Sequence, residues 1–302
     1  MIKQVTTALV FSLAMPLAML GTACSAQENV AESNDVTVQE NNIPAEAWRK
    51  VDAENLLLID TAYGVIGVEL YPELAPAHVE QVKALARSGF YDNVPFHRVI
   101  EGFMNQTGDG TNGDGSGDSD LPDLKGNFTF RRDNSMPVTL ISARQEGGKS
   151  IDVGFYKSLP VASQPIAQAM LTADGKVTAY GLHCKGVTSM ARTNDPDSAN
   201  SQFFLMRDRA SHLDRKYTIW GNTVMGHKFL RRFKVGNAGE EGFVPDQMNT
   251  VRVAADLAEE DRPKAYVMKT NHPAFQTYLK KEAKADGSYP DICDISVPTK
   301  TE

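Results

Sequence analysis

The sequence predicts a mainly β fold, because many of its apolar residues stand in short runs that resemble strands. Residues 56–61 and 67–71 are two such runs, and the short turn between them indicates an opening hairpin. Residues 98–106 and 201–206 are two further runs of strand-forming residues. With 302 residues, of which 41% are hydrophobic, the chain is long enough for a large domain with a full core.

Two segments have the spacing of helices. Residues 77–88 follow Pro76, place four apolar residues on one face and end at Gly89, so they predict a helix after the hairpin. Residues 273–285 predict a second helix, in the C-terminal part of the chain. Between them, residues 250–255 are expected to be the closing strand of the main domain.

The first 24 residues are typical of a secretory signal peptide. Lys3 supplies one positive charge, and the apolar run at residues 8–20 is too short to span a bilayer as a permanent helix. The segment ends either in a small-residue cleavage site or in a lipobox-like site where Cys24 would be lipid-modified. We favour a lipoprotein, although the leucine of the lipobox lies one position too far upstream. Residues 25–47 are polar and predict a flexible tether.

The charge of the chain argues against a nucleic-acid partner. The sequence carries 31 basic and 38 acidic residues, a formal net charge of −7. Removal of the signal segment takes away only Lys3 among the charged residues, so the mature protein remains acidic. An acidic chain repels the phosphate backbone, so we expect no nucleic-acid partner. As a separate expectation, we take the protein to be a monomer.

The cysteine count indicates a disulfide. If Cys24 is the lipid anchor, Cys184 and Cys293 remain as an even pair in an oxidising compartment. They are candidates for one bridge, which would stabilise the fold by about 4 kcal/mol on the chain-entropy model. The alternative is two buried free thiols.

Residues 110–120 are rich in glycine and aspartate. The spacing of their carboxylates loosely suggests calcium, an ion that takes several oxygen ligands from one loop. The match to an EF-hand fails, because no glutamate closes the loop and no helices flank it. We therefore interpret the run as a glycine-rich turn and predict no metal site.

Two motifs in the strand-like runs are the most informative features of the chain. Residues 96–109 have the pattern FHR-x-I-x-GFM-x-Q-x-GD, and residues 201–204 read SQFF. Both motifs, in this order, resemble the cyclophilins, the peptidyl-prolyl cis-trans isomerases. The resemblance covers residues 55–133 and 181–257, about half of the chain. It implies an eight-stranded antiparallel β-barrel capped by two α-helices, and residues 223–233 are the expected location of the second helix.

The resemblance also sets the expected domain limits. Residues 48–257 would form the cyclophilin-like domain, with an insert at about 134–180 that departs from the family. The insert is too apolar for a disordered linker and predicts extra β-structure or an ordered loop that widens, covers or flanks the substrate groove. Residues 258–302 would be a C-terminal extension packed on the domain, tied there by the bridge from Cys184 to Cys293.

The resemblance assigns catalytic roles to two residues. Arg98 would donate a hydrogen bond to the proline nitrogen as the amide twists, and Gln106 would hold Arg98 or the substrate backbone. His97 could suggest a general base. We reject this reading, because neighbouring residues of a strand face opposite sides, so His97 should point into the barrel when Arg98 points to the groove.

The same resemblance places a pocket for the proline ring and a groove for the flanking peptide. Two positions depart from many family members: His212 stands where a tryptophan is frequent, and Tyr217 where a histidine is frequent. Cyclosporin binding should therefore be weak, whereas catalysis should survive. Arg192 replaces a frequent asparagine. The expected substrate-binding residues are Phe103, Met104, Ala191, Gln202, Phe204, His212, Leu213 and Tyr217.

The resemblance implies a peptidyl-prolyl cis-trans isomerase that acts without a cofactor on proline-containing polypeptides. Together with the signal segment, it predicts a periplasmic protein that assists the folding of exported proteins and has a membrane tether if Cys24 is lipidated. The alternative function is a proline-peptide-binding chaperone or scaffold module with little or no isomerase activity. An insert that blocks the groove would favour that alternative.

Overall fold

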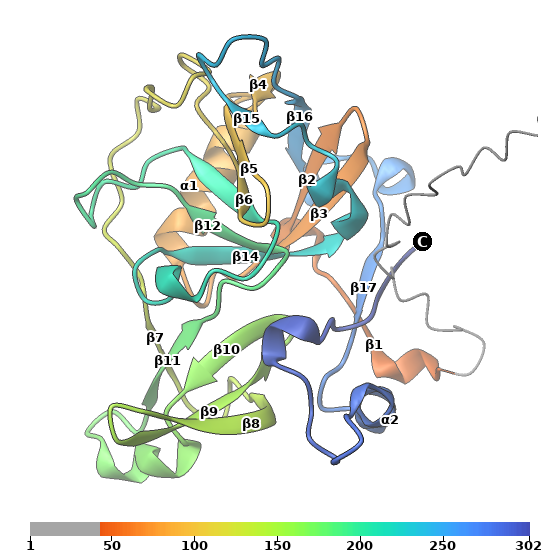
Figure 1. The fold of residues 1–302 in the computed structure, drawn as a ribbon. Coiled ribbons are helices and arrows are strands. Elements are labelled where there is room, and N and C mark those ends of the chain that lie inside the picture. The colour runs from red at the N-terminus through yellow and green to blue at the C-terminus, as the bar shows by residue number, and fades with distance from the viewer. Residues whose placement is uncertain (1–42) are drawn as a thin grey trace, which may run out of the picture. The chain divides into compact units, whose positions relative to one another are not determined.

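The computed structural model describes residues 43–302 (Figure 1). The predicted signal peptide, the lipidation site at Cys24 and most of the predicted tether lie outside the described residues. The described part of the chain contains three antiparallel sheets and two α-helices. The prediction of a mainly β fold is confirmed.

The main sheet has ten strands in the order β15-β5-β6-β13-β12-β14-β3-β2-β16-β4. β4 leads into β5 through Phe96 and His97 alone, although these strands lie near opposite ends of the sheet. The sheet must therefore curl until its edges meet, and Figure 1 shows the curled shape. Its strands are β2 (Leu56–Thr61), β3 (Gly64–Leu70), β4 (Val94–Pro95), β5 (Arg98–Ile100), β6 (Met104–Thr107), β12 (Val187–Met190), β13 (Phe203–Met206), β14 (Ile219–Met225), β15 (Gly236–Asn237) and β16 (Gln247–Val253).

Helix α1 (Pro76–Arg87) packs on this sheet. Its predicted apolar face is buried, and Val79 and Val82 pack in one cluster with Phe96 and Trp220 from the sheet. Gly89 adopts a positive φ of 74° just after the helix, a conformation that glycine tolerates best. The sequence therefore specified both ends of α1 to within one or two residues.

The predicted second capping helix at residues 223–233 is wrong. The first three of these residues finish β14, and the chain then turns through the 3-10 helix η6 (His227–Arg231). Thr223 and Met225 pair with β3 on either side of a bulge at Val224, so sheet pairing overrides the weak helical preference of the segment.

Residues between β6 and β12 form a second sheet, in the order β7-β11-β10-β9-β8. The segment at 134–180 is thus extra β-structure rather than a loop. The short η4 (Ile166–Leu171) lies between β10 and β11. The strands are β7 (Phe130–Arg132), β8 (Thr139–Glu146), β9 (Lys149–Tyr156), β10 (Leu159–Ser163) and β11 (Val177–Gly181).

The C-terminal residues join β1 in a small third sheet, which packs on β2 and β14 of the main sheet, and their helix packs on the second sheet. β17 (Ala265–Met268) lies between β1 (Trp48–Lys50) and β18 (Thr299–Thr301). Helix α2 (Pro273–Glu282) then presents Phe275 edge-on to Phe155 of β9, with ring centres 5.9 Å apart. Short 3-10 helices complete the described chain: η2 (Ala45–Ala47), η3 (Ala53–Asn55), η5 (Ser211–Leu213), η7 (Ala254–Asp256), η8 (Glu259–Asp261) and η9 (Ile292–Asp294).

Candidate active site

Strand register places Arg98, Gln106 and Phe204 in one row across β5, β6 and β13. Arg98 is directly opposite Gln106, and Gln106 is directly opposite Phe204. Directly paired residues of adjacent strands share a face of the sheet, so these three side chains stand side by side. Arg98 donates from Nη1 to Gln106 Oε1 at 3.1 Å. The predicted partnership of Arg98 with Gln106 is therefore present in the structure.

A chain of amides connects this row to the glycine-rich turn. Gln106 donates to Gln202 Oε1 at 3.2 Å, and Gln202 Nε2 donates to the carbonyl oxygens of Gly115 and Gly117, both at 2.9 Å. In both glutamines, the side-chain oxygen accepts from the residue nearer to Arg98, and the side-chain NH2 group donates toward the turn. The orientation of the Arg98 guanidinium thus depends on the conformation of residues 110–117.

Asp109 anchors that turn. Its buried carboxylate accepts backbone N–H groups from residues 111, 112, 115 and 117, at 2.8 to 3.1 Å. Burial by itself would raise the pKa of Asp109, but the backbone donors outweigh it and lower the pKa to about 2. A side chain at Gly117 would collide with this carboxylate. These contacts favour the glycine-rich turn over calcium, because the oxygens that would bind an ion already accept hydrogen bonds.

Replacing Asp109 by asparagine is expected to destabilise the fold by roughly 2 kcal/mol at neutral pH. A lowered pKa means that the carboxylate stabilises the native state above about pH 4, and that this contribution disappears as the pH falls toward 2. Urea denaturation between pH 2.5 and 7 should show this pH dependence in the wild type and a weaker one in D109N. D114N is the matched control, because among residues 43–302 the exposed Asp114 side chain hydrogen-bonds to Ser116 of the same turn and to no other residue.

A matching loss of stability in D109N and D114N at neutral pH would contradict the anchoring role of Asp109. An equal dependence of the unfolding free energy on pH in D109N and the wild type would also contradict this role.

The predicted pocket residues lie together in one apolar cluster at this face of the sheet. Met104, Phe204 and Leu213 are buried, at 2%, 5% and 7% exposure. Partly buried side chains pack around them: Phe103, Ala191 and Tyr217. Met104 shares its face with Gln106, because alternate residues of a strand point the same way. The structure therefore brings the cation and the apolar cluster to the same face.

The two positions that depart from the family also contact this cluster. The Tyr217 ring meets Phe204 edge-on with centres 5.8 Å apart. His212 is exposed at the rim, and its ring centre lies 5.7 Å from that of Phe103. His97 is buried, whereas Arg98 is only half-buried, as expected for alternate faces. Burial lowers the pKa of His97 and so disfavours its charged form.

The family of the chain follows from this arrangement and from comparison with known proteins. The model of the cyclophilin-type peptidyl-prolyl cis-trans isomerase/CLD family matches residues 56–254. This chain belongs to the cyclophilins. A probable peptidyl-prolyl cis-trans isomerase of Brucella suis is 32% identical over 217 residues, which cover 68% of this chain and 85% of the relative. The crystal structure of the cyclophilin AquaCyp293 from Hirschia baltica has a TM-score of 0.76 and 39% identity, covering 84% of this chain and 93% of that chain.

This cyclophilin supports its pocket floor with a buried polar pair that the sequence analysis missed. His183 Nδ1 lies 2.9 Å from Asp214 Oδ1, and its Nε2 lies 3.2 Å from Ser189 Oγ. The His183 ring stacks on Phe204 at 6.2 Å between centres. The set resembles a catalytic triad, but Ser189 is fully buried and its hydroxyl donates to the Thr218 carbonyl. It positions Phe204 and is not accessible to a substrate.

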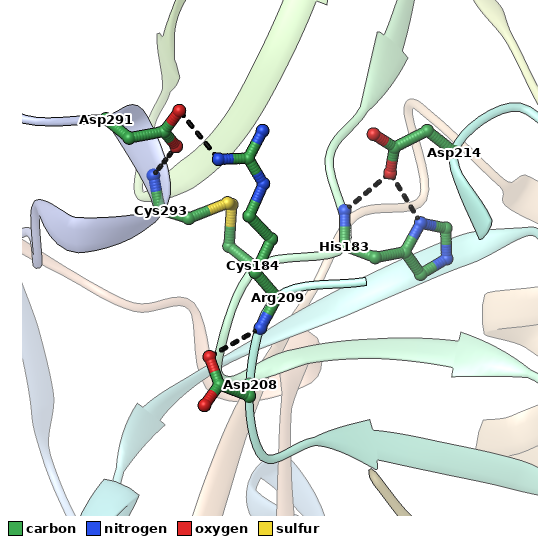
Figure 2. Close-up of a disulfide and its surroundings, with 7 residues drawn as sticks. All are labelled: His183, Cys184, Asp208, Arg209, Asp214, Asp291 and Cys293. Atoms are coloured by element: carbon green, nitrogen blue, oxygen red, sulfur yellow. Dashed lines mark hydrogen bonds and ion pairs between the residues drawn. A yellow bond between two sulfur atoms is a disulfide. The ribbon is translucent and has the colours of Figure 1, made fainter. Parts of the chain in front are cut away.

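No sequence signal pointed to this pair, because 31 residues separate His183 from Asp214 and neither belongs to a recognisable motif. Asp214 also accepts the backbone N–H of His183 at 2.9 Å. Figure 2 shows the pair next to the bond between Cys184 and Cys293. Two neighbouring residues of the link between β11 and β12 therefore make both contacts: His183 pairs with Asp214, and Cys184 bonds to Cys293.

Cys184 and Cys293 form a disulfide in the structure (Figure 2). Cys184 lies in the link from β11 to β12, and Cys293 lies in η9 of the C-terminal extension. Asp291 reinforces this junction by accepting the Cys293 N–H at 3.0 Å and pairing with Arg209 at 2.7 Å. The bond ties the extension to the chain segment directly behind the pocket.

The described residues offer few other sites for chemistry. In residues 43–302, no group of three or more His, Cys, Asp or Glu side chains is arranged to hold a metal ion. No helix in this part of the chain is long and apolar enough to cross a membrane. The candidate active site consists of the row from Arg98 to Phe204 and the apolar cluster beside it.

Proposed function

We propose that this cyclophilin isomerises X-Pro bonds of exported polypeptides and assists their folding in the periplasm, and that Arg98 stabilises the twisted amide. The isomerase activity itself follows from membership of the family. The observation that supports the Arg98 mechanism most is the shared face of Arg98, Gln106 and Phe204.

The chemistry requires neither a nucleophile nor a cofactor. Amide resonance gives the C–N bond partial double-bond character, and the barrier to rotation is about 18–20 kcal/mol. At the top of the barrier the proline nitrogen loses this resonance and can accept a hydrogen bond. A donor that bonds to this nitrogen only in the twisted state therefore lowers the barrier.

Arg98 is well suited to be that donor. Among the residues that the structure describes, Gln106 is its one hydrogen-bond partner, and no carboxylate of residues 43–302 forms an ion pair with it. Most of its five N–H donors are therefore available to a substrate. The hydrogen bond to Gln106 limits the motion of the guanidinium, which reduces the entropy lost when the substrate binds.

The apolar cluster would bind the proline ring. Phe103, Met104, Phe204 and Leu213 supply apolar surface on the face where Arg98 lies. Burial of a pyrrolidine ring there would hold the peptide while the residue before the proline rotates. Ala191 and Gln202 would line the adjoining groove, and they are joined by a backbone hydrogen bond of 2.9 Å from the Ala191 N–H.

The role in folding is tested on a protein substrate whose refolding is limited by proline isomerisation. Such a slow phase lasts tens to hundreds of seconds at 25 °C. Catalytic amounts of this cyclophilin should accelerate that phase without changing the fast phases. An unchanged slow phase, in a preparation that isomerises short peptides, would argue against a folding role.

The periplasmic location is supported by the signal segment and by the bond between Cys184 and Cys293, since disulfides persist in oxidising compartments. In a Gram-negative host, we expect the mature chain to begin at Cys24, carry a lipid and appear in the membrane fraction. C24A should not carry the lipid. Mass spectrometry of the N-terminus together with cell fractionation tests this, and a full-length chain in the cytoplasm would refute the proposal.

A further inference from the structure

Arg192 is a second cation beside the pocket, and its backbone contacts hold it in place. It follows directly after Ala191, one of the groove residues. Its Nε donates to the Lys216 carbonyl at 3.0 Å, and its Nη1 donates to the Thr193 carbonyl at 2.8 Å. These bonds use two of the five N–H donors of the guanidinium, so three donors remain for a ligand.

Two aromatic rings lie close to the same guanidinium. Its central carbon lies 4.5 Å from the centre of the Tyr217 ring and 5.8 Å from that of Phe128. Tyr217 in turn contacts Phe204 of the pocket floor. Arg192 is therefore separated from the proline pocket by a single ring. An extended peptide advances about 3.3–3.6 Å per residue, so the residues one or two positions from the proline are the ones whose side chains we expect near Arg192.

A shallow hollow open to solvent lies beside these rings. Phe128, Phe130 and Tyr217 are in its lining, and a side chain there would lie across its open surface. Two of these rings are the ones that hold Arg192. A short side chain with an apolar stem could lie over the rings while its polar end meets the guanidinium.

The charge of Arg192 is not neutralised by the protein itself. No carboxylate of residues 43–302 forms an ion pair with it. The nearest acidic residues in sequence use their carboxylates on the backbone: Asp195 accepts the N–H of Asp197 at 2.9 Å, and Asp197 accepts the N–H of Gly126 at 2.8 Å. Exposed Lys216 adds further positive charge. The site therefore lacks the anionic partner that a fixed guanidinium favours.

We propose that Arg192 selects substrates with an acidic side chain within two residues of the isomerised proline. The carboxylate would accept hydrogen bonds from the remaining guanidinium N–H groups, with Tyr217 and Phe128 supporting the stem. Because the guanidinium is already held by four contacts, little further conformational entropy is lost on binding. The inference rests on the isomerase activity and adds a preference among its substrates.

The test uses pairs of proline peptides in which one member carries glutamate and the other glutamine at the same position. Separate pairs place this residue one or two positions before the proline and one or two positions after it. NMR exchange measures kcat/KM at low and high salt. At one or more positions, the wild type should prefer glutamate about fivefold at low salt, mainly through KM, and salt should weaken the preference. R192Q should bring the ratio close to one, and R192K should give an intermediate ratio.

K216Q is the matched control, because it removes a neighbouring charge and leaves intact the backbone carbonyl that holds Arg192. It should keep the glutamate preference. A ratio near one at every position in the wild type, an unchanged ratio in R192Q, or a ratio abolished by K216Q would overturn the inference. If the wild type isomerises neither peptide of any pair, the isomerase function itself fails, which is a different result.

Discussion

Replacing Arg98 by alanine is expected to lower kcat/KM for X-Pro isomerisation by roughly 100- to 1000-fold, the usual effect of removing a transition-state hydrogen-bond donor. The loss should fall mainly on kcat, because the donor acts on the twisted amide and not on the planar substrate. The melting temperature should change little, since Arg98 bonds within the described chain only to Gln106. A peptide isomerisation assay and a thermal melt measure both quantities.

Two further variants make the result specific. R98K keeps the charge but loses the planar fork, so it should recover only part of the activity. R131A is the control: it removes an exposed arginine of β7, in the second sheet, that pairs with Asp174. This variant should retain full activity. Equal activity in R98A and the wild type would refute the proposed mechanism. Tight binding of proline peptides without turnover by the wild type would favour the chaperone function instead.

Removing the bond between Cys184 and Cys293 is expected to lower the free energy of unfolding by about 4 to 5 kcal/mol. The two residues are 109 positions apart in the sequence, so the bond restricts a long loop of the unfolded chain. Alanine is the suitable replacement at both positions, because Cys184 is 2% exposed and a polar group there would lack a partner. Chemical denaturation of the double variant measures the loss.

A reducing agent provides the control for this substitution. It should destabilise the wild type toward the level of the double alanine variant and leave that variant unchanged. Similar stability of wild type and variant under oxidising conditions would show that the bond does not contribute. Mass spectrometry after thiol labelling of the unfolded wild type should detect no free thiol at either cysteine.

The local elements were predictable from the sequence because their causes are local. Pro76 and Gly89 bracket α1, and its apolar spacing identified the buried face. The strands around Arg98 and Phe204 were recognised from β-forming residues in short runs. The prediction of a helix at 223–233 was wrong because the cause there is not local: the helical preference is weak, and pairing of β14 with β3 decides the structure.

The pocket residues were predicted through a family resemblance and not through spacing. Residues 96–109 and 201–204 carry motifs that identify the cyclophilins, and position-by-position transfer then named the pocket residues. Their proximity depends on pairing between β6 and β13, which are about 100 residues apart in the chain. The residue pattern of either strand alone does not reveal that β6 pairs with β13, because the pairing of distant strands and its register are set by tertiary packing.

The sequence by itself determined the mainly β character, the helix α1, the family and the identity of the arginine at the site, since these depend on residue type and on short-range order. Only the tertiary structure decided that Asp109 anchors the turn that supports Gln202, that His183 stacks on Phe204, and that Arg192 lies close to two aromatic rings. The physical reason is that each of these contacts joins side chains from different segments. They form only after the sheet has curled and set its register.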